Sequence, residues 1–254
     1  MTGLRAEAGP QPSDGARRHA RSTTHVLVWD FDGTLAYRDG GMWSAALMEV
    51  LRRQAPEVTV RAERIQPHLQ AGFPWQSPHQ PHPEIQTPEE WWDRLTPTFV
   101  QAFHSLGFDI SRARSFACQV RHAYTDPQRW RLFHDVLPTL EELTTQGWTH
   151  VVLSNHVPEL PGIIEHLGLH PHFARIFNSA ETGYEKPHPQ SFQMVLDVFP
   201  DATAVWVIGD SLTADISGTR ALGIPAILVH RSGKDAAHVC DRISEVPAIV
   251  NQGR

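Results

Sequence analysis

An apolar run near the amino terminus stops abruptly at two carboxylates. Residues 25–29 (HVLVW) are mostly apolar and rich in β-branched side chains, and the segment Asp30-Phe31-Asp32-Gly33 follows them directly. A short apolar run that ends at a turn signal is typical of a strand buried on both faces. We therefore predict a buried strand over residues 25–29, with the two carboxylates in the loop after it.

Four more apolar runs follow along the chain and alternate with amphipathic helical patterns. The strands are predicted at residues 149–153, 175–178, 205–208 and 226–229, and the helices at 137–146, 158–167, 189–199 and 214–222. Strands that alternate with helices pair in parallel, because each helix returns the chain to the edge where the previous strand began. The pattern predicts an α/β fold with a Rossmann-like, doubly wound parallel sheet.

A long segment after the first strand breaks this alternation. Residues 39–130 show helical patterns only, and we expect them to form an all-α cap inserted into a core made of 25–38 and 131–254. Thr87-Pro88-Glu89-Glu90 is a capping box with proline at the first helical position, which marks a helix start. The cap helices are predicted at 42–54, 59–68, 88–106 and 111–124, and the proline-rich stretch 73–83 is predicted to be an extended loop.

The ends and the composition of the chain exclude several classes of protein. Residues 1–24 contain no valine, isoleucine or aromatic side chain, which predicts a disordered tail. The net charge of -6 offers no electrostatic footprint for nucleic acid or for an anionic membrane surface. Cys118 and Cys240 form no C-x-x-C pair, and no apolar run is long enough to span a membrane. We therefore expect a cytoplasmic protein that binds neither nucleic acid nor membranes.

Polar side chains follow several of the predicted strands at the point where each strand ends. In an open parallel sheet, ligands bind beyond the carboxyl ends of the strands, so these residues are expected to share one site. Lys186 attracts particular attention because it is one of only two lysines among 22 basic residues. The group comprises Asp30, Asp32, Ser154, Asn155, Lys186, Gly209, Asp210, Ser211 and Asp215.

The order and placement of these residues resemble the motifs of the haloacid dehalogenase superfamily. Asp30-Phe31-Asp32-Gly33-Thr34-Leu35 matches its first motif residue for residue, and Val151-Val152-Leu153-Ser154-Asn155 is similar to its second. Lys186-Pro187 resembles the third motif, and Gly209-Asp210-Ser211-Leu212-Thr213-Ala214-Asp215 resembles the fourth. The helical insert has the position of the type-one (C1) cap of this superfamily, which suggests a phosphatase-like member.

The resemblance implies roles for the two carboxylates of the first motif, for the residues of the second motif and for Lys186. Asp30 would attack phosphorus and form an aspartyl-phosphate, which splits one difficult step into two. Asp32 would protonate the leaving oxygen and later deprotonate the attacking water. Ser154 and the backbone N–H of Asn155 would bind phosphoryl oxygens, while Lys186 would act in catalysis and bind the phosphate.

The resemblance also implies a Mg²⁺ cofactor. The ion would be held by the carboxylate of Asp30, the main-chain carbonyl of Asp32 and the carboxylate of Asp210. Asp215 and Ser211 would order the groups around the ion rather than bind it, and Gly33 would allow the close turn that brings the first two carboxylates together. A phosphate dianion that faces this many carboxylates needs such cations beside it.

These roles predict the Mg²⁺-dependent hydrolysis of a small phosphomonoester through an aspartyl-phosphate. Asp32 favours an ester over a haloacid, because a halide leaves without a proton and dehalogenating members of the superfamily lack an acid there. Residues 39–130 contain no lysine, so the Schiff base of a phosphonatase is not available. A phosphotransferase or phosphomutase remains the alternative, and a non-catalytic regulatory protein that binds a phosphorylated ligand remains a less favoured one.

The cap offers candidate contacts for the substrate. Trp75, His79, His82, Trp91 and Trp92 could each face the site, although for adjacent tryptophans on one helix only one is expected to face a core. A metal held by the two histidines is disfavoured, since no third ligand is evident. We expect the 73–83 loop to gate the site, so that alanine at Trp75 or His79 changes KM. Tyr37 and Arg38 are expected to form a small flap.

Overall fold

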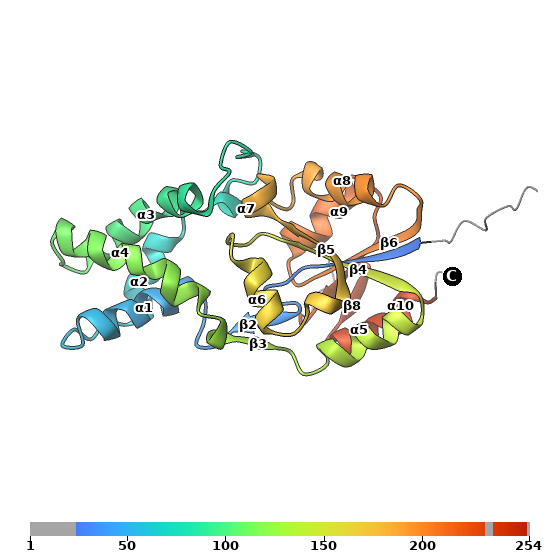
Figure 1. Ribbon diagram of the computed structural model, residues 1–254, viewed down its shortest axis with the longest axis horizontal. Coiled ribbons are helices and arrows are strands. Elements are labelled where there is room, and N and C mark those ends of the chain that lie inside the picture. The colour runs from blue at the N-terminus through green and yellow to red at the C-terminus, as the bar shows by residue number, and fades with distance from the viewer. Residues whose placement is uncertain (1–23, 232–235, 253–254) are drawn as a thin grey trace, which may run out of the picture.

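The computed structural model describes residues 24–231 and 236–252 of the chain (Figure 1). The disordered tail predicted for residues 1–24 therefore lies outside the described residues except for Thr24, which begins strand β1 (Thr24–Trp29). In Figure 1, helices α1 (Trp43–Gln54), α2 (Ala62–Ile65), α3 (Pro88–Ser105) and α4 (Ile110–Thr125) lie at one end of the molecule, and the sheet with its flanking helices lies at the other.

Six strands form one parallel sheet, in the order β5-β4-β1-β6-β7-β8. This order confirms the predicted Rossmann-like α/β fold, in which the chain winds outward from the central β1 in both directions. The edge strand β8 was not predicted from the sequence. The other strands are β4 (Trp148–Ser154), β5 (Phe173–Asn178), β6 (Ala202–Gly209), β7 (Ala226–Val229) and β8 (His238–Cys240).

Successive side chains of β1 point to opposite faces of the sheet, and both faces are buried. Val26 and Val28 pack in one apolar layer, while Leu27 and Trp29 pack in the other. All four side chains are at most 2% exposed. A strand buried on both faces cannot move without opening two layers, which fixes the place where the strand ends.

Helices cover both faces of the sheet (Figure 1). Leu140 and Ile163 belong to the layer of Trp29, whereas Phe192 belongs to the layer of Val28. One layer contains residues of α5 (Val136–Thr145), α6 (Leu160–His166) and α10 (Val246–Val250), and the other contains residues of α8 (Pro189–Val198). The shorter helices are α7 (Ser179–Thr182) and the 3-10 turns Pro127–Arg129, His170–His172 and Ile243–Glu245.

The helix predicted at residues 214–222 is different in the structure. A π-helix spans Leu212–Ser217 and is followed by the short α9 (Gly218–Arg220). The carbonyl of Ser211 accepts the N–H groups of both Asp215 (3.0 Å) and Ile216 (3.2 Å), the second of which is the i to i−5 bond of a π-helix. π-Helical turns are common at functional sites, and this one keeps the Asp215 side chain beneath the end of the sheet.

The chain between two short strands, residues 36–38 and 130–132, is largely helical. Strand β2 (Ala36–Arg38) pairs antiparallel with β3 (Trp130–Leu132), so Tyr37 and Arg38 do lie in a small β-ribbon. The predicted helix at 59–68 is only partly α-helical, because Pro67 has no N–H to donate and a 3-10 turn begins at Gln66. The helices are α1 (Trp43–Gln54), α2 (Ala62–Ile65), the 3-10 turn Gln66–Leu69, α3 (Pro88–Ser105) and α4 (Ile110–Thr125).

The expectation of an extended chain over residues 73–83 is wrong in part. A 3-10 turn spans Pro74–Gln76, and the side-chain amide of Gln76 closes it by accepting the N–H of Phe73 (3.0 Å). Phe73 is buried against Trp43, which anchors the turn to the helices. The several prolines of the segment therefore allow a compact turn where the sequence indicated an open loop.

Both Trp91 and Trp92 are buried, at 0% and 6% exposure, although only one was expected to be. The start of α3 lies between two packing surfaces. Trp91 faces Trp75 in the insert, and the indole N–H of Trp92 donates to Glu159 (3.1 Å), which precedes α6. A helix with apolar neighbours on two sides can bury adjacent residues.

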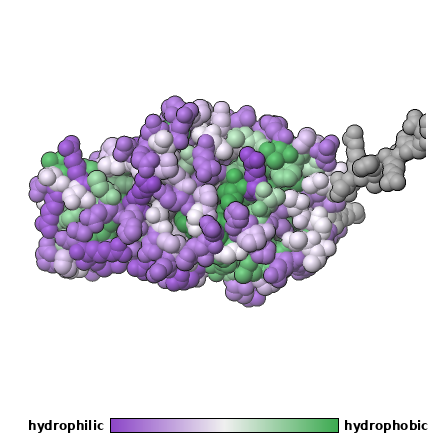
Figure 2. Space-filling view, in the orientation of Figure 1, coloured by the Kyte–Doolittle hydropathy of each residue, from purple (hydrophilic) through white to green (hydrophobic). Residues whose placement is uncertain are grey.

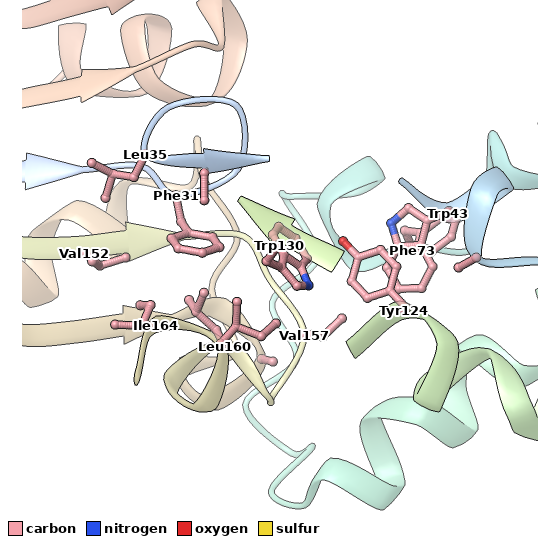
Figure 3. Packing of buried hydrophobic residues seen from close by; sticks show 14 of the residues in the cluster. Phe31, Leu35, Trp43, Phe73, Tyr124, Trp130, Val152, Val157, Leu160 and Ile164 are labelled. Carbon is pink, nitrogen blue, oxygen red and sulfur yellow. The ribbon is translucent and has the colours of Figure 1, made fainter. Parts of the chain in front are cut away.

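Aromatic side chains connect the sheet with the helical insert. Phe31, Trp130, Tyr124 and Trp43 lie in a row from the end of β1 to the ends of α1 and α4 (Figure 3). Hydrophilic residues cover most of the face in Figure 2, with smaller hydrophobic areas between them. Among the described residues, no helix combines the length and the apolar character needed to cross a membrane.

Candidate active site

Asp30 follows the last residue of β1 and is the centre of the site. Its backbone N–H donates to the carbonyl of Ile208 (2.9 Å), which extends the strand pairing by one residue and fixes the Cα position. Its carboxylate accepts hydrogen bonds from Lys186 Nζ (2.8 Å), Ser154 Oγ (3.1 Å) and Thr34 Oγ1 (3.3 Å). The side chain is buried yet lines a cavity, so it is oriented before any ligand arrives.

Lys186 lies between two carboxylates. Its Nζ donates to Asp30 Oδ1 (2.8 Å) and to Asp215 Oδ1 (2.7 Å), and the side chain is 2% exposed. Burial alone would lower the pKa of Lys186, but the nearby charges of Asp215 and Asp30 outweigh it and raise the pKa above its ordinary value. The lysine is therefore a fixed positive charge at any physiological pH.

Asp215 holds Lys186 in place. Its Oδ1 accepts from Lys186, and its Oδ2 accepts the backbone N–H of Ser211 (3.1 Å). Burial raises the pKa of Asp215 to about 7, although Lys186 acts in the opposite direction. Ser211 also caps the π-helix, since its Oγ accepts the N–H of Ala214 (3.1 Å).

Asn155 fixes the backbone around Lys186. Its Nδ2 donates to the carbonyl of Lys186 (2.8 Å), and its Oδ1 accepts the N–H of the same residue (2.7 Å). This pair of bonds joins the end of β4 to the loop before α8, two segments 31 residues apart in the chain. The side chain therefore acts on the lysine, while the predicted contact of the Asn155 N–H with phosphate stays a prediction.

Asp32 is partly buried, and its Oδ1 has no hydrogen-bond partner. Burial raises the pKa of Asp32 well above its ordinary value, and the charges of Asp30 and Asp210 raise it further. A raised pKa allows this carboxyl to carry a proton near neutral pH. The group can then donate a proton to an oxygen in the cavity, which it also lines.

His156 is a residue of the site that the sequence reasoning missed. Its Nε2 lies 3.6 Å from Asp32 Oδ2, and the buried ring packs against Phe31, Tyr124 and Trp130. Burial lowers the pKa of His156 to about 4, so the ring is neutral. The only sequence signal for His156 was its position directly after Ser154-Asn155. Its packing against aromatic rings produces no recognisable pattern in a sequence.

Three carboxylates could supply oxygen ligands to a metal ion. One ligand atom from each of Asp30, Asp210 and Asp215 lies within 4.8 Å of the others. Asp215 is the most deeply buried of the three at 0% exposure, so Asp30 at 7% and the Asp210 side chain at 19% are the pair more open to the cavity. Oxygen donors of this kind suit a hard divalent cation, so the residues fit the predicted ion. Asp210 also accepts a hydrogen bond from the exposed Arg231 (2.9 Å), which the sequence did not indicate.

Gly33 has a backbone φ of +77°, and an added Cβ would lie 2.6 Å from Asp210 Oδ2. Gly33→Ala is therefore expected to lower the free energy of unfolding by about 1–2 kcal/mol and to displace the Asp210 carboxylate. Gly40→Ala is a matched control, because Gly40 has a φ of +78° and no atom within 4 Å of the added Cβ. Urea unfolding should show a similar cost for both variants, whereas only Gly33→Ala should lose activity. Equal losses of activity would contradict the close-approach argument.

A cavity of about 510 Å³ opens above these groups. Its lower part includes Asp30, Asp32 and Lys186, and its upper part is formed by the helical insert, with Trp43 and Tyr124 among its residues. The site residues predicted at the strand ends therefore meet at one cavity or directly beneath it. The remaining residues around the cavity are Met42, Trp75, Gln76, Pro78, Asn155, His156, Pro187, Ser211, Thr213, Ala214 and Asp215.

Only one of the five candidate contacts from the insert reaches this cavity. Trp75 lines it, whereas His79 is exposed and does not line it. His82 is buried and pairs with the buried Glu185, with its Nε2 3.0 Å from Oε1. The 73–83 loop is thus attached to the residue that precedes Lys186. Because His79 does not line the cavity, an effect of His79→Ala on KM is no longer expected. Gating by the loop stays a prediction.

A parallel Rossmann-like sheet with a carboxylate at the end of its first strand and a buried lysine beside it defines a class of α/β hydrolases. Residues 24–223 match the family model described as haloacid dehalogenase-like hydrolase. The chain belongs to this family.

Relatives support the same assignment. The human haloacid dehalogenase-like hydrolase domain-containing protein 3 is 32% identical over 145 residues, which are 56% of this chain and 57% of that protein. A phosphoserine phosphatase from Thermus thermophilus is 31% identical over 137 residues, 52% of this chain and 53% of its own. The chain thus matches little more than half the length of these relatives.

A solved structure matches the fold over almost the whole chain. The 2-haloacid dehalogenase of Pseudomonas syringae has a TM-score of 0.65 at 23% identity, and the match covers 91% of this chain and 100% of the dehalogenase. At this identity the likeness concerns the fold alone, because one fold carries different chemistries.

Proposed function

We propose that this hydrolase cleaves a small phosphomonoester through a phosphorylated Asp30, with Mg²⁺ as cofactor. The observation that carries the proposal is the presence of a buried carboxylate, a buried ammonium and a second carboxyl with a raised pKa at one cavity. These are a nucleophile, a group that neutralises phosphate charge and a proton donor. The phosphatase among the relatives supports this reading.

Asp30 is placed to attack and Asp32 to transfer the proton. Lys186 lies 2.8 Å from Asp30 and holds the carboxylate in one orientation. The leaving alkoxide of an ester needs a proton, and the raised pKa of Asp32 favours the protonated carboxyl that can donate one. After the alcohol departs, the same carboxylate can take a proton from the water that attacks phosphorylated Asp30. A haloacid needs no such donor, which favours the ester.

Asp30 and Asp210 would hold the ion, together with the main-chain carbonyl of Asp32. Bound Mg²⁺ supplies a compact positive charge that screens the phosphate from the surrounding carboxylates. The Ser154 hydroxyl lies next to Asp30 and would bind a phosphoryl oxygen. The helical insert closes the cavity from above and acts as the cap of the site.

Phosphate release from phenyl phosphate, measured in Mg²⁺ and after removal of the metal with EDTA, tests the proposal. We expect turnover in Mg²⁺, a loss of at least about 100-fold in EDTA, and recovery when Mg²⁺ is returned. Covalent phosphorylation without release of phosphate, relieved by an added alcohol, would show the phosphotransferase instead. Binding of phosphate without any turnover would indicate the regulatory alternative.

A further inference from the structure

The part of the cavity formed by the helical insert is built from uncharged side chains. We define the insert wall as Met42, Trp43, Trp75, Gln76, Pro78 and Tyr124. It faces the carboxylates and Lys186 across the cavity, so it surrounds whatever group the phosphate is attached to. Three of its six residues are aromatic, and Met42 at 37% exposure lies at its rim.

Gln76 in this wall and Arg38 next to it already have partners. The Gln76 amide donates to the carbonyl of Leu69 (3.0 Å) and accepts the N–H of Phe73 (3.0 Å). Arg38, which is 5.8 Å from the Tyr124 ring, is 3% exposed and pairs with Glu49 (3.1 Å). Among the described residues that line the cavity, Lys186 is therefore the only lysine or arginine.

The aromatic rings of the wall form a rigid surface. Trp43 and Tyr124 are stacked with centroids 3.8 Å apart and planes inclined by 9°, and Trp75 stacks on Trp43 at 5.9 Å. Trp43 and Tyr124 are buried and cover each other's faces, and Phe73 packs against Trp43 (Figure 3) and against Trp75. Rings that are held in place before binding can contact a ligand ring through an edge or a free face, and little side-chain entropy is lost.

We propose that the insert wall selects phosphomonoesters whose alcohol carries an uncharged aromatic or other planar ring. The inference rests on the proposed function and names its substrate class. A carboxylate or a second phosphate against this wall would lose its hydration without gaining a cation, which is costly. A ring would instead bury apolar surface on Trp75 and its neighbours. The cavity of about 510 Å³ has room for such a group beyond the phosphate.

Three esters that differ in one group test the proposal. Phosphate release is measured for ethyl phosphate, 2-phenylethyl phosphate and phosphoglycolate, whose alkyl leaving groups are similar. We expect kcat/KM for 2-phenylethyl phosphate to exceed that for ethyl phosphate by at least about 10-fold, and phosphoglycolate to be the poorest of the three. Trp75→Ala should lower this ratio by about 3-fold or more. His79→Ala, an exposed position on the same loop outside the cavity, should leave the ratio unchanged.

Binding of phosphonates separates this inference from the proposed chemistry. Calorimetry with 2-phenylethylphosphonate and ethylphosphonate in Mg²⁺ measures affinity without turnover, and tighter binding of the phenyl compound supports the wall as a ring site. Equal affinities and equal kcat/KM values with active enzyme would overturn it, as would a preference for phosphoglycolate. Selective binding of the phenyl compound without hydrolysis of any ester would contradict the proposed function but still support the ring site.

Discussion

Asp30→Asn is expected to abolish phosphate release, by at least about 10⁴-fold, while the fold is kept. An amide cannot attack phosphorus, and Asp215, the other carboxylate beside Lys186, is 0% exposed with both oxygens hydrogen-bonded. The change is isosteric, so Oδ1 can still accept from Lys186 and from Ser154 as it does now. The measurement is phosphate release from phenyl phosphate, together with mass spectrometry of acid-quenched protein to detect one added phosphoryl group.

Asp93→Asn is the matched control for this variant, because Asp93 is exposed on α3 and does not line the cavity. It should retain wild-type activity and the covalent adduct. If Asp30→Asn retained more than about 1% of wild-type turnover, or if the adduct lay on another residue, Asp30 would not be the nucleophile.

The place of the candidate catalytic groups was predictable because it follows from backbone topology. Parallel strands end at one edge of a sheet, so residues after β1, β4 and β6 had to come together once the sheet was parallel. Asp30, Ser154 and Asp210 meet at this edge as the sequence indicated. Gly33 was predictable for a similar reason, since its positive φ belongs to the loop that the motif defines.

The contacts between the insert and the core were not predictable in the same way. Trp92 reaches Glu159, and His82 reaches Glu185 across 103 residues of chain. Hydrophobic periodicity reports which face of a helix is apolar, but a helix that packs on two sides has no single apolar face. The prediction of an extended loop at 73–83 was wrong in part. The side chain of Gln76 accepts a local hydrogen bond and closes a turn that composition does not reveal.

The side chain of Asn155 has a role that the resemblance did not provide. The resemblance implied a phosphate contact of its backbone N–H, which stays a prediction, and the structure shows its side chain bound to both backbone groups of Lys186. Removing this amide would act through the lysine. The raised pKa values of Asp32 and Asp215 also depend on three-dimensional burial, which spacing along the chain cannot provide.

Lys186→Met is expected to remove activity and to destabilise the protein by about 3–5 kcal/mol at pH 8, because two buried carboxylates lose their shared cation. The raised pKa of Lys186 means that its stabilising charge is fully present at neutral pH and is lost only well above it. Burial raises the pKa of Asp215 to about 7 in the folded wild-type protein, and without Lys186, which lowers it, the pKa in the folded variant is higher still. Above pH 7 the folded variant therefore keeps a proton that the folded wild-type protein has lost, so the deficit should grow with pH there, by at most about 1.4 kcal/mol per unit, and level off below pH 7.

Urea unfolding in EDTA between pH 7 and pH 9 measures this deficit, and the double variant Lys186→Met/Asp215→Asn shows its origin. Asn at 215 removes the buried charge but can still accept the N–H of Ser211. The double variant should recover most of the stability at pH 8 and lose the pH dependence of the deficit, yet remain inactive because Asp30 still lacks its ammonium. If the double variant is as unstable as the single one at pH 8, the lysine stabilises the protein by packing. In that case removing the Asp215 carboxylate does not restore the free energy of unfolding.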